Sequence, residues 1–346
     1  MYQATLLCQL CIGPNPSGDT NFVAPDLSNY LTINIDTRNN WTELPPWSIS
    51  GAMTALTPRK PTYLPSQSAV AVLAESLGDA AFASTLAKGL AVLEAFDAGA
   101  TMLGNMELSA RTGISRPTVA RLTHTLAELG YLRYEEKLAK FCLGARPLRM
   151  VRPLLAGMPF RQLARPLMQE LAESVRGTVS IGLLDGTAMI YVETARSGDV
   201  GAHVPDIGLL IPVISTAMGR AAASLLPPAG LTSIEERIRA DSPEQWSIHR
   251  EKYRAAVADC GTRGFCTCFG EYLASVHAVA APLFHSENLK QFFSINCGIP
   301  AFRLQPGQLE AEIGPRVAAL ASSIRALANV AEPPIERRES ARKATK

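Results

Sequence analysis

The 346-residue sequence lacks long hydrophobic runs, a large excess of charge of either sign and an ordered pattern of cysteines. No run approaches the roughly 18 apolar residues that a membrane-spanning helix needs. The N-terminus also lacks the basic region that opens a secretory signal peptide. These absences argue against an integral membrane protein and a secreted one, so we expect a cytoplasmic protein.

The seven cysteines are odd in number and scattered, which fits reduced thiols better than a disulfide framework. Cys8 and Cys11 form a C-x-x-C pair, but no second pair follows at the spacing of a zinc site. The sequence therefore predicts neither a structural metal nor another cofactor.

The net charge of +2 is too small to argue by itself for a nucleic-acid partner, so the distribution of charge matters more than its total. Residues 84–150 contain nine Lys or Arg and six Asp or Glu, a surplus of three basic residues. The length and a hydrophobic content of 47% allow two or three domains with sizeable cores. The basic surplus lies in the part of the chain that carries its clearest motif.

That motif is a helix, a tight turn and a second helix over residues 106–131. Gly113 closes the first helix, Ser115 is a good N-cap, and Pro117 falls in the first turn of the second helix, where its missing N–H is harmless. Apolar residues at steps of three and four then give the second helix one inward stripe. They are Val119, Leu122, Leu126 and Leu129.

The opposite face of this second helix carries arginines and short hydroxyl side chains. Such a face suits a DNA recognition helix, because guanidinium and hydroxyl groups reach phosphate oxygens and base edges in the major groove. The same composition is also common on a helix that is merely solvated. The residues that we expect to contact DNA are Ser115, Arg116, Thr118, Val119, Arg121, Thr125, Lys137 and Lys140.

The flanking segments complete a winged helix-turn-helix. Two short strands, residues 131–134 and 141–143, enclose a charged turn, where Lys137 and Lys140 can meet the phosphate backbone. Residues 145–160 form a linker helix interrupted by prolines. A helix over residues 85–96 precedes the motif, and its expected inward residues are Leu86, Leu90, Leu93 and Phe96.

The C-terminal part has the pattern of an α+β sheet domain. Two apolar runs meet at Asp185-Gly186, a strong hairpin signal, and residues 276–284 and 289–297 form a second hairpin. Strands flanked by long helices predict a sheet with helices on its faces. The helices expected here cover residues 165–174, 216–226, 233–264, with a break at 241–243, and 305–330.

The first 81 residues differ from the rest of the chain. Prolines and Asn, Ser and Thr clusters interrupt every short apolar run, so we expect disorder, or a leader that is not made, since Met53 is an in-frame methionine. The expected boundaries are 1–81 for this extension, 82–145 for the winged helix, 146–162 for the linker helix, 163–332 for the second domain and 333–346 for a flexible tail.

With these pieces in place, residues 82–330 resemble the IclR family of bacterial transcriptional regulators. Two domains match it in the right order. Residues 84–93 are similar to its opening helix, 111–122 with 126–131 to its helix-turn-helix, 141–144 to its wing exit, 208–221 to its Pro-Leu-x-x-Thr-Ala-x-Gly-Lys-Ala segment, and 263–271 with 279–283 to its late signature.

The resemblance implies an N-terminal winged helix-turn-helix joined by a linker helix to a GAF-like α/β effector-binding domain. It implies a homodimer or a dimer of dimers that reads a palindromic operator in double-stranded DNA with half-sites about one helical turn apart. It also implies that a small organic acid or related metabolite binds the second domain. The protein would then be a transcription factor and not an enzyme.

The effector site implied by the resemblance combines a helix N-terminus, whose free N–H groups suit a carboxylate, with side chains of the late strands. The family usually has an acidic, polar run between Gly264 and Glu271, whereas this chain has Phe-Cys-Thr-Cys-Phe-Gly. That departure indicates an aromatic or apolar effector. The expected effector residues are Ser215, Thr216, Ala217, Met218, Cys266, Cys268, Glu271, Ser294 and Cys297.

Three kinds of alternative stay open at the level of sequence. Met218 and the cysteines are also typical core residues, since free cysteine is among the most buried residue types. Cys266-x-Cys268, with His277 nearby, permits a metal site or a GAF-type cysteine oxidoreductase that acts on free methionine sulfoxide and carries an accessory winged helix. A third possibility is a winged helix that binds a partner protein in place of DNA.

Overall fold

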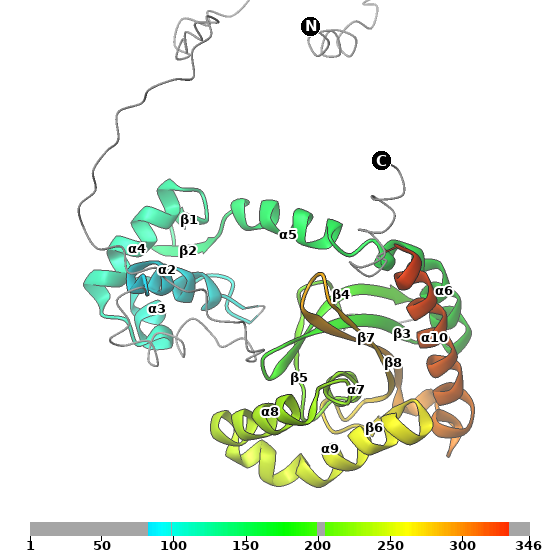
Figure 1. Cartoon of the computed structure of the whole chain (residues 1–346). Helices are drawn as coiled ribbons and strands as arrows, with labels where there is room; N and C mark the ends of the chain where they lie inside the picture. The colour runs from blue at the N-terminus through cyan, green and yellow to red at the C-terminus, as the bar shows by residue number, and fades with distance from the viewer. Residues whose placement is uncertain (1–81, 98, 199–204, 332–346) are drawn as a thin grey trace, which may run out of the picture. The chain divides into compact units, whose positions relative to one another are not determined.

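The computed structural model describes residues 82–97, 99–198 and 205–331. The expectations for residues 1–81 and 333–346 lie outside the described residues. Within the described ranges, no helix is long and apolar enough to cross a membrane. The N-terminal elements are α2 (Ser84–Glu94), α3 (Asn105–Thr112), α4 (Arg116–Glu128), β1 (Leu132–Glu135) and β2 (Lys140–Leu143) (Figure 1).

These elements form the predicted winged helix. Gly113, with a φ of 69°, makes the left-handed turn between α3 and α4 that a residue with a side chain rarely adopts. The two strands pair antiparallel from Leu132↔Leu143 to Glu135↔Lys140. A small core of apolar residues from all three helices and both strands holds the unit together. The fully buried Leu108 and Val119 lie within it.

The predicted inward face of α2 is half wrong. Leu93 and Phe96 pack against the core, but Leu86 and Leu90 are 65% and 46% exposed. Ala91 and Val92 are the buried residues of α2. The face of α2 that packs on the core therefore runs through Ala91 and Val92, and the two leucines are left on the outside.

The linker helix is confirmed as α5 (Arg146–Ala156), and the helix expected to begin at residue 165 begins earlier, as α6 (Phe160–Val175). No side chain of α5 is buried. Phe160 is the first residue of α6. It is fully buried, because it packs edge-on against Phe284 and Phe293 of the sheet. The prolines at 147 and 153 are tolerated within α5.

The C-terminal domain is built on one six-stranded antiparallel sheet in the order β5-β4-β3-β8-β7-β6. Both predicted hairpins are confirmed as β3–β4 and β7–β8, and Gly186, with a φ of 61°, makes the first turn. The strands are β3 (Thr178–Asp185), β4 (Ala188–Arg196), β5 (Leu210–Pro212), β6 (Cys266–Phe269), β7 (Val276–Ser286) and β8 (Gln291–Pro300).

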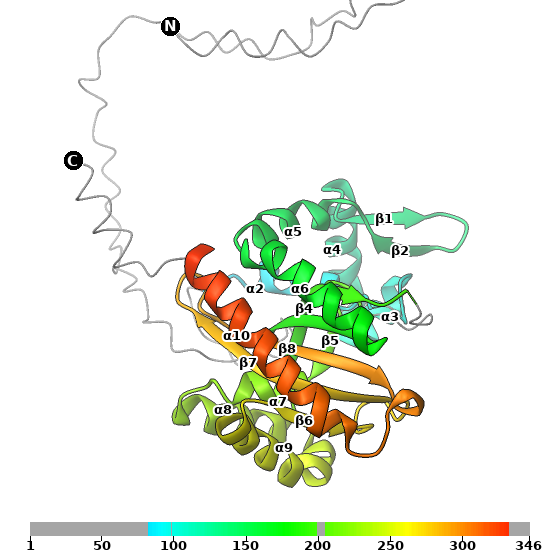
Figure 2. The ribbon, with the colours of Figure 1, turned by 90° about the vertical axis from the view of Figure 1, so that its right-hand side faces the viewer.

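Helices cover both faces of this sheet (Figures 1 and 2). One face packs against α6 and α10, and the other against α7, α8 and α9. The break expected at residues 241–243 separates α8 from α9. The remaining helices are α7 (Ala217–Ala223), α8 (Pro228–Asp241), α9 (Pro243–Arg263), η1 (Ala301–Arg303), η2 (Leu309–Ile313) and α10 (Gly314–Ala331).

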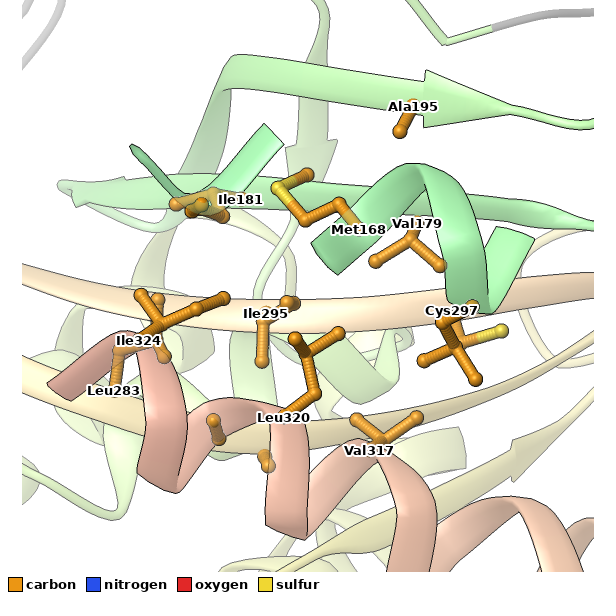
Figure 3. Close-up of a cluster of buried hydrophobic side chains, with 14 of the residues drawn as sticks. Met168, Val179, Ile181, Ala195, Leu283, Ile295, Cys297, Val317, Leu320 and Ile324 are labelled. Atoms are coloured by element: carbon orange, nitrogen blue, oxygen red, sulfur yellow. The ribbon is translucent and has the colours of Figure 1, made fainter. Parts of the chain in front are cut away.

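The larger core lies between the sheet and the α6/α10 layer. Figure 3 shows Val179, Ile181 and Ile295 of the central strands facing Leu320 and other side chains of α10. Because successive strand residues point to opposite faces, the odd-numbered residues 293–299 of β8 enter this core. The even-numbered residues of β8 are left for the face that α7 covers.

Candidate DNA-binding surface and effector site

Helix α4 presents the predicted basic face to solvent. Arg116, Arg121 and Thr125 are exposed, and Thr118 is partly exposed. Ser115 occupies the N-cap position, but its hydroxyl lies 3.0 Å from that of Thr118 and makes no side-chain cap bond to the helix backbone. This face therefore offers two guanidinium groups and a cluster of hydroxyls at the start of α4.

Two predictions about α4, for Val119 and for Leu129, are wrong. Val119 is fully buried, so its side chain is unavailable to DNA and its assignment as a contact residue is wrong. Thr123 replaces Leu129 in the inward stripe: it is fully buried, and its hydroxyl donates to the Val119 carbonyl oxygen, whereas Leu129 is 51% exposed. The Thr123 hydroxyl also lies 3.0 Å from Asn105 Oδ1, which ties α4 to the start of α3.

The two wing lysines have different surroundings. Lys137 is exposed in the turn between β1 and β2. Lys140 Nζ instead lies 2.9 Å from Glu107 Oε1, and the other oxygen of that carboxylate accepts a hydrogen bond from the Gly104 N–H. Lys140 is thus paired with Glu107, and this ion pair links the wing to α3.

In the second domain, α7 and the loop before it lie over small residues of the sheet. The Thr216 hydroxyl caps α7 by accepting from Gly219 N–H and donates to the Pro212 carbonyl. Met218 is fully buried above Gly182, where an added Cβ would lie 2.4 Å from its sulfur. The Ser294 hydroxyl donates to the Met218 carbonyl. Ser215, Thr216, Ala217 and Met218 are therefore all held in the interior.

Most of the other predicted effector residues converge on this segment. The thiols of Cys266 and Cys268 donate to the carbonyls of Ala217 and Ser215, at 3.5 and 3.4 Å. Cys297 is the exception. It points from the opposite face of β8 into the core beneath α10, near Val317 (Figure 3). Its assignment to the effector site is wrong, because it lies three positions after Ser294 and an odd step reverses the face of a strand.

Glu271 belongs to a buried charge cluster. Arg220 of α7 is 1% exposed; its Nε donates to the Ile214 carbonyl and its terminal nitrogens pair with the Glu271 carboxylate. His249 Nδ1 lies 3.6 Å and Lys252 Nζ 3.8 Å from that carboxylate. Burial acts to raise the pKa of Glu271, but Arg220 and then the Lys252 charge outweigh it and hold the pKa below its usual value.

A polar row that the sequence reasoning missed crosses the sheet on the same face. Thr194, Ser180 and Asn296 are direct neighbours on β4, β3 and β8. The hydroxyls of Ser180 and Thr194 lie 3.1 Å apart. Asn296 Oδ1 is buried without a hydrogen-bond partner among the described residues. A buried acceptor without a donor costs free energy, so this atom is suited to meet a donor on a ligand.

Tyr191 borders this row. Burial raises the pKa of Tyr191 to about 12, against a smaller opposing effect of its hydrogen bond with Asn296. The phenol is therefore neutral at physiological pH and can take part in hydrogen bonding. A cleft of about 540 Å³ that includes Thr194 of this row opens at the C-terminal end of β4, and none of the nine predicted effector residues lines it. Its lining includes Arg165, Glu193, Thr194, Arg196 and Asp206.

Comparison with known families decides what this pair of domains is. Residues 85–136 match the IclR helix-turn-helix domain, and residues 153–326 match the bacterial transcriptional regulator IclR C-terminal domain. The chain belongs to the IclR family of bacterial transcriptional regulators. It is a DNA-binding transcriptional regulator with a GAF-like effector-binding domain.

Individual relatives agree with this assignment. An IclR-family regulator from Brucella abortus is 33% identical, covers 76% of this chain and 99% of its own, and superposes with a TM-score of 0.69. The regulator TsaQ1/TsaQ2 from Comamonas testosteroni is 27% identical over 72% of this chain and 90% of its own length. An IclR homologue from Microbacterium hydrocarbonoxydans, solved with 4-hydroxybenzoate, shares the fold at 19% identity and a TM-score of 0.55, covering 71% of this chain and 99% of its own.

IclR membership also resolves the sequence-level alternatives for the activity. The family is non-enzymatic, so the cysteine oxidoreductase alternative is wrong. The winged helix is a DNA-binding one, which removes the reading of a module that binds only a partner protein.

One signal could have located Asn296 in this IclR chain. It follows Ser294 by two positions on one strand, so both must share a face. Ser180 and Thr194 needed the strand register, which the hairpin turn fixes only once the bulge between Ile181 and Gly182 is known.

Proposed function

We propose that the chain binds a palindromic operator as a homodimer or a dimer of dimers and that a small organic metabolite bound to its C-terminal domain controls this binding. The observation that carries the DNA-binding part is the exposed basic face of α4, with Arg116 and Arg121 backed by a buried Val119 and Thr123. A rigid helix with guanidiniums on its outer side is suited to base edges in the major groove.

Salt dependence tests this assignment. Fluorescence anisotropy on the DNA upstream of the protein's own gene is expected to give a logarithm of the association constant that falls linearly with the logarithm of salt concentration. Each phosphate contact contributes about −0.9 to the slope. Binding that does not respond to salt would contradict a DNA-contacting α4 and wing.

Exposed apolar side chains support a dimer. On α2, Leu86 and Leu90 face outward, and α5 exposes Leu148 by 72% and Leu154 by 52%. A single exposed residue of this size costs little, but several exposed leucines on two helices favour burial against a second copy of the chain. Two recognition helices related by a twofold axis would then meet half-sites about 34 Å apart.

For the effector we propose an aromatic acid that carries a hydrogen-bond donor, held on the face of the sheet that α7 covers. The Asn296 Oδ1 atom, buried and without a hydrogen-bond partner among the described residues, supports a ligand that donates a hydrogen bond. The residues of this face are small, Gly182 and Ala280 among them, and α7 packs against them, which favours a small ligand over a bulky one. The compound 4-hydroxybenzoate, which the Microbacterium homologue binds, has this chemistry and is the probe of choice.

Replacing Asn296 with Leu is expected to weaken 4-hydroxybenzoate binding about tenfold, because one hydrogen bond in a buried site is lost. Isothermal titration calorimetry with benzoate, which lacks the hydroxyl donor, gives the comparison. The wild type would prefer 4-hydroxybenzoate to benzoate, and the variant would not. Cys297→Ala is the control, since Cys297 lies on the same strand but faces the opposite core. Equal affinity of wild type and Asn296→Leu for both acids would refute the assignment.

A further inference from the structure

Three thiols meet beneath α7, and their chemistry is independent of the proposed function. Cys260 lies in the last turn of α9, and Cys266 and Cys268 lie on β6. All three are buried, with 5%, 0% and 4% exposure. They form one compact cluster with small side chains, namely Ala217, Ala221, Ala256 and Ala280.

Cys260 and Cys266 are a hydrogen-bonded thiol pair. The hydrogen bond from Cys266 lowers the pKa of Cys260, helped by Ser224 and opposed by burial, while that contact and burial raise the pKa of Cys266. Cys260 is therefore the thiol of the pair that ionises first. An ionised sulfur is the nucleophile in thiol oxidation.

The single hydrogen of the Cys266 thiol has two acceptors within reach. One is the sulfur of Cys260, and the other is the carbonyl oxygen of Ala217, 3.5 Å from Cys266 Sγ. Ala217 is the first residue of α7, the helix that carries Met218 and Arg220. Any reaction that consumes this hydrogen removes a donor from the start of α7.

We propose that Cys260 and Cys266 are an oxidation site that a hydroperoxide closes into a disulfide, releasing the Ala217 carbonyl from its thiol donor. With hydrogen peroxide as the hydroperoxide, the Cys260 thiolate attacks one peroxide oxygen, the O–O bond breaks, and hydroxide leaves and takes up a proton to form water. The resulting sulfenic acid is attacked by the Cys266 thiolate, the S–O bond breaks, and a second water is formed. With hydrogen peroxide, two thiols give one disulfide and two waters.

The competing pairings are less favourable. Cys266 and Cys268 are two apart on a strand, so their Cα atoms lie roughly 6.6 Å apart, near the upper limit for a disulfide. Cys268 donates to the Ser215 carbonyl, and burial raises its pKa. The thiol–thiol hydrogen bond selects Cys260 and Cys266.

Peptide mapping tests the pairing on the full-length protein. Trypsin cleaves after Arg263, between the two cysteines, so a Cys260–Cys266 disulfide joins two tryptic peptides that a Cys266–Cys268 disulfide would leave separate. After hydrogen peroxide treatment and alkylation, we expect this joined peptide in the wild type and in Cys268→Ser, and its loss in Cys266→Ser. Persistence of the link in Cys266→Ser would overturn the pairing. Oxidation of the partly exposed Cys142 shows that the peroxide has reacted with the protein. If Cys142 is oxidised in the wild type and the joined peptide is absent, the pairing is also overturned.

Hydrogen exchange tests the consequence for α7. In the disulfide-linked protein, the rate of amide exchange in residues 217–223 is expected to rise several-fold, because α7 has lost the hydrogen bond from Cys266 of β6 to the Ala217 carbonyl. Reduction should restore the original rate. Exchange in α10, which packs on the opposite face, should not change. Unchanged exchange in α7 of fully linked protein would overturn the release of Ala217.

Discussion

Replacing both Arg116 and Arg121 with Ala is expected to weaken operator binding by roughly 30- to 25,000-fold. Each arginine that contacts a base edge contributes about 1–3 kcal/mol, and the two lie on one exposed face of α4. Anisotropy titration at fixed salt measures the loss. Circular dichroism and melting temperature should stay at the wild-type values, because neither side chain is buried.

Two matched variants make this result specific. Arg239→Ala with Arg250→Ala removes the same charge from exposed positions on α8 and α9, and we expect wild-type affinity. Arg116→Lys with Arg121→Lys keeps the charge but loses the bidentate geometry, so it should bind all DNA with similar, weaker affinity. If the double alanine variant binds the operator as tightly as wild type, α4 is not the recognition helix.

Arg220→Met is expected to lower the free energy of unfolding by about 3–5 kcal/mol, because it leaves the carboxylate of Glu271 buried without its main partner. Urea denaturation of the full-length protein measures this loss. The double variant Arg220→Met/Glu271→Leu should recover most of the stability, since no uncompensated charge remains. Lys290→Met, which breaks an exposed pair with Glu287, is the control and should cost less than about 1 kcal/mol. A loss that small for Arg220→Met would contradict the account.

The same cluster gives stability a pH dependence of defined sign. Burial lowers the pKa of His249 below 6.5, so the folded state favours the neutral imidazole and loses stability as pH falls below 6.5. The lowered pKa of Glu271 adds a second loss as pH falls below 4.5. In Arg220→Met the second loss should shrink, because Glu271 no longer has the charge that held its pKa down.

Local signals in the sequence were sufficient for the architecture. The Asp185-Gly186 turn, the Gly113 turn and the break at Pro243 each act over a few residues, and all appear where they were predicted. Side-chain direction was harder. The leucine pattern of α2 pointed inward by periodicity, yet Leu86 and Leu90 are exposed, because packing is decided by the partner helix and not by the helix itself.

The effector face shows the same limit. Cys297 could have been excluded by strand parity alone, and Asn296 included by the same rule. In contrast, the pairing of Lys140 with Glu107 joins residues 33 positions apart, and that of Arg220 with Glu271 joins residues 51 apart. No periodicity within one element reports such contacts, since they depend on how the elements pack together.

The most direct test of the proposed switch is the affinity of the full-length protein for its operator with and without saturating 4-hydroxybenzoate, measured by anisotropy. We expect a change of about 5- to 150-fold in the dissociation constant for DNA, the usual range of coupling between two sites, and we expect Asn296→Leu to abolish this change. A protein that binds the acid at the Asn296 face while its affinity for DNA stays the same would contradict the proposed switch.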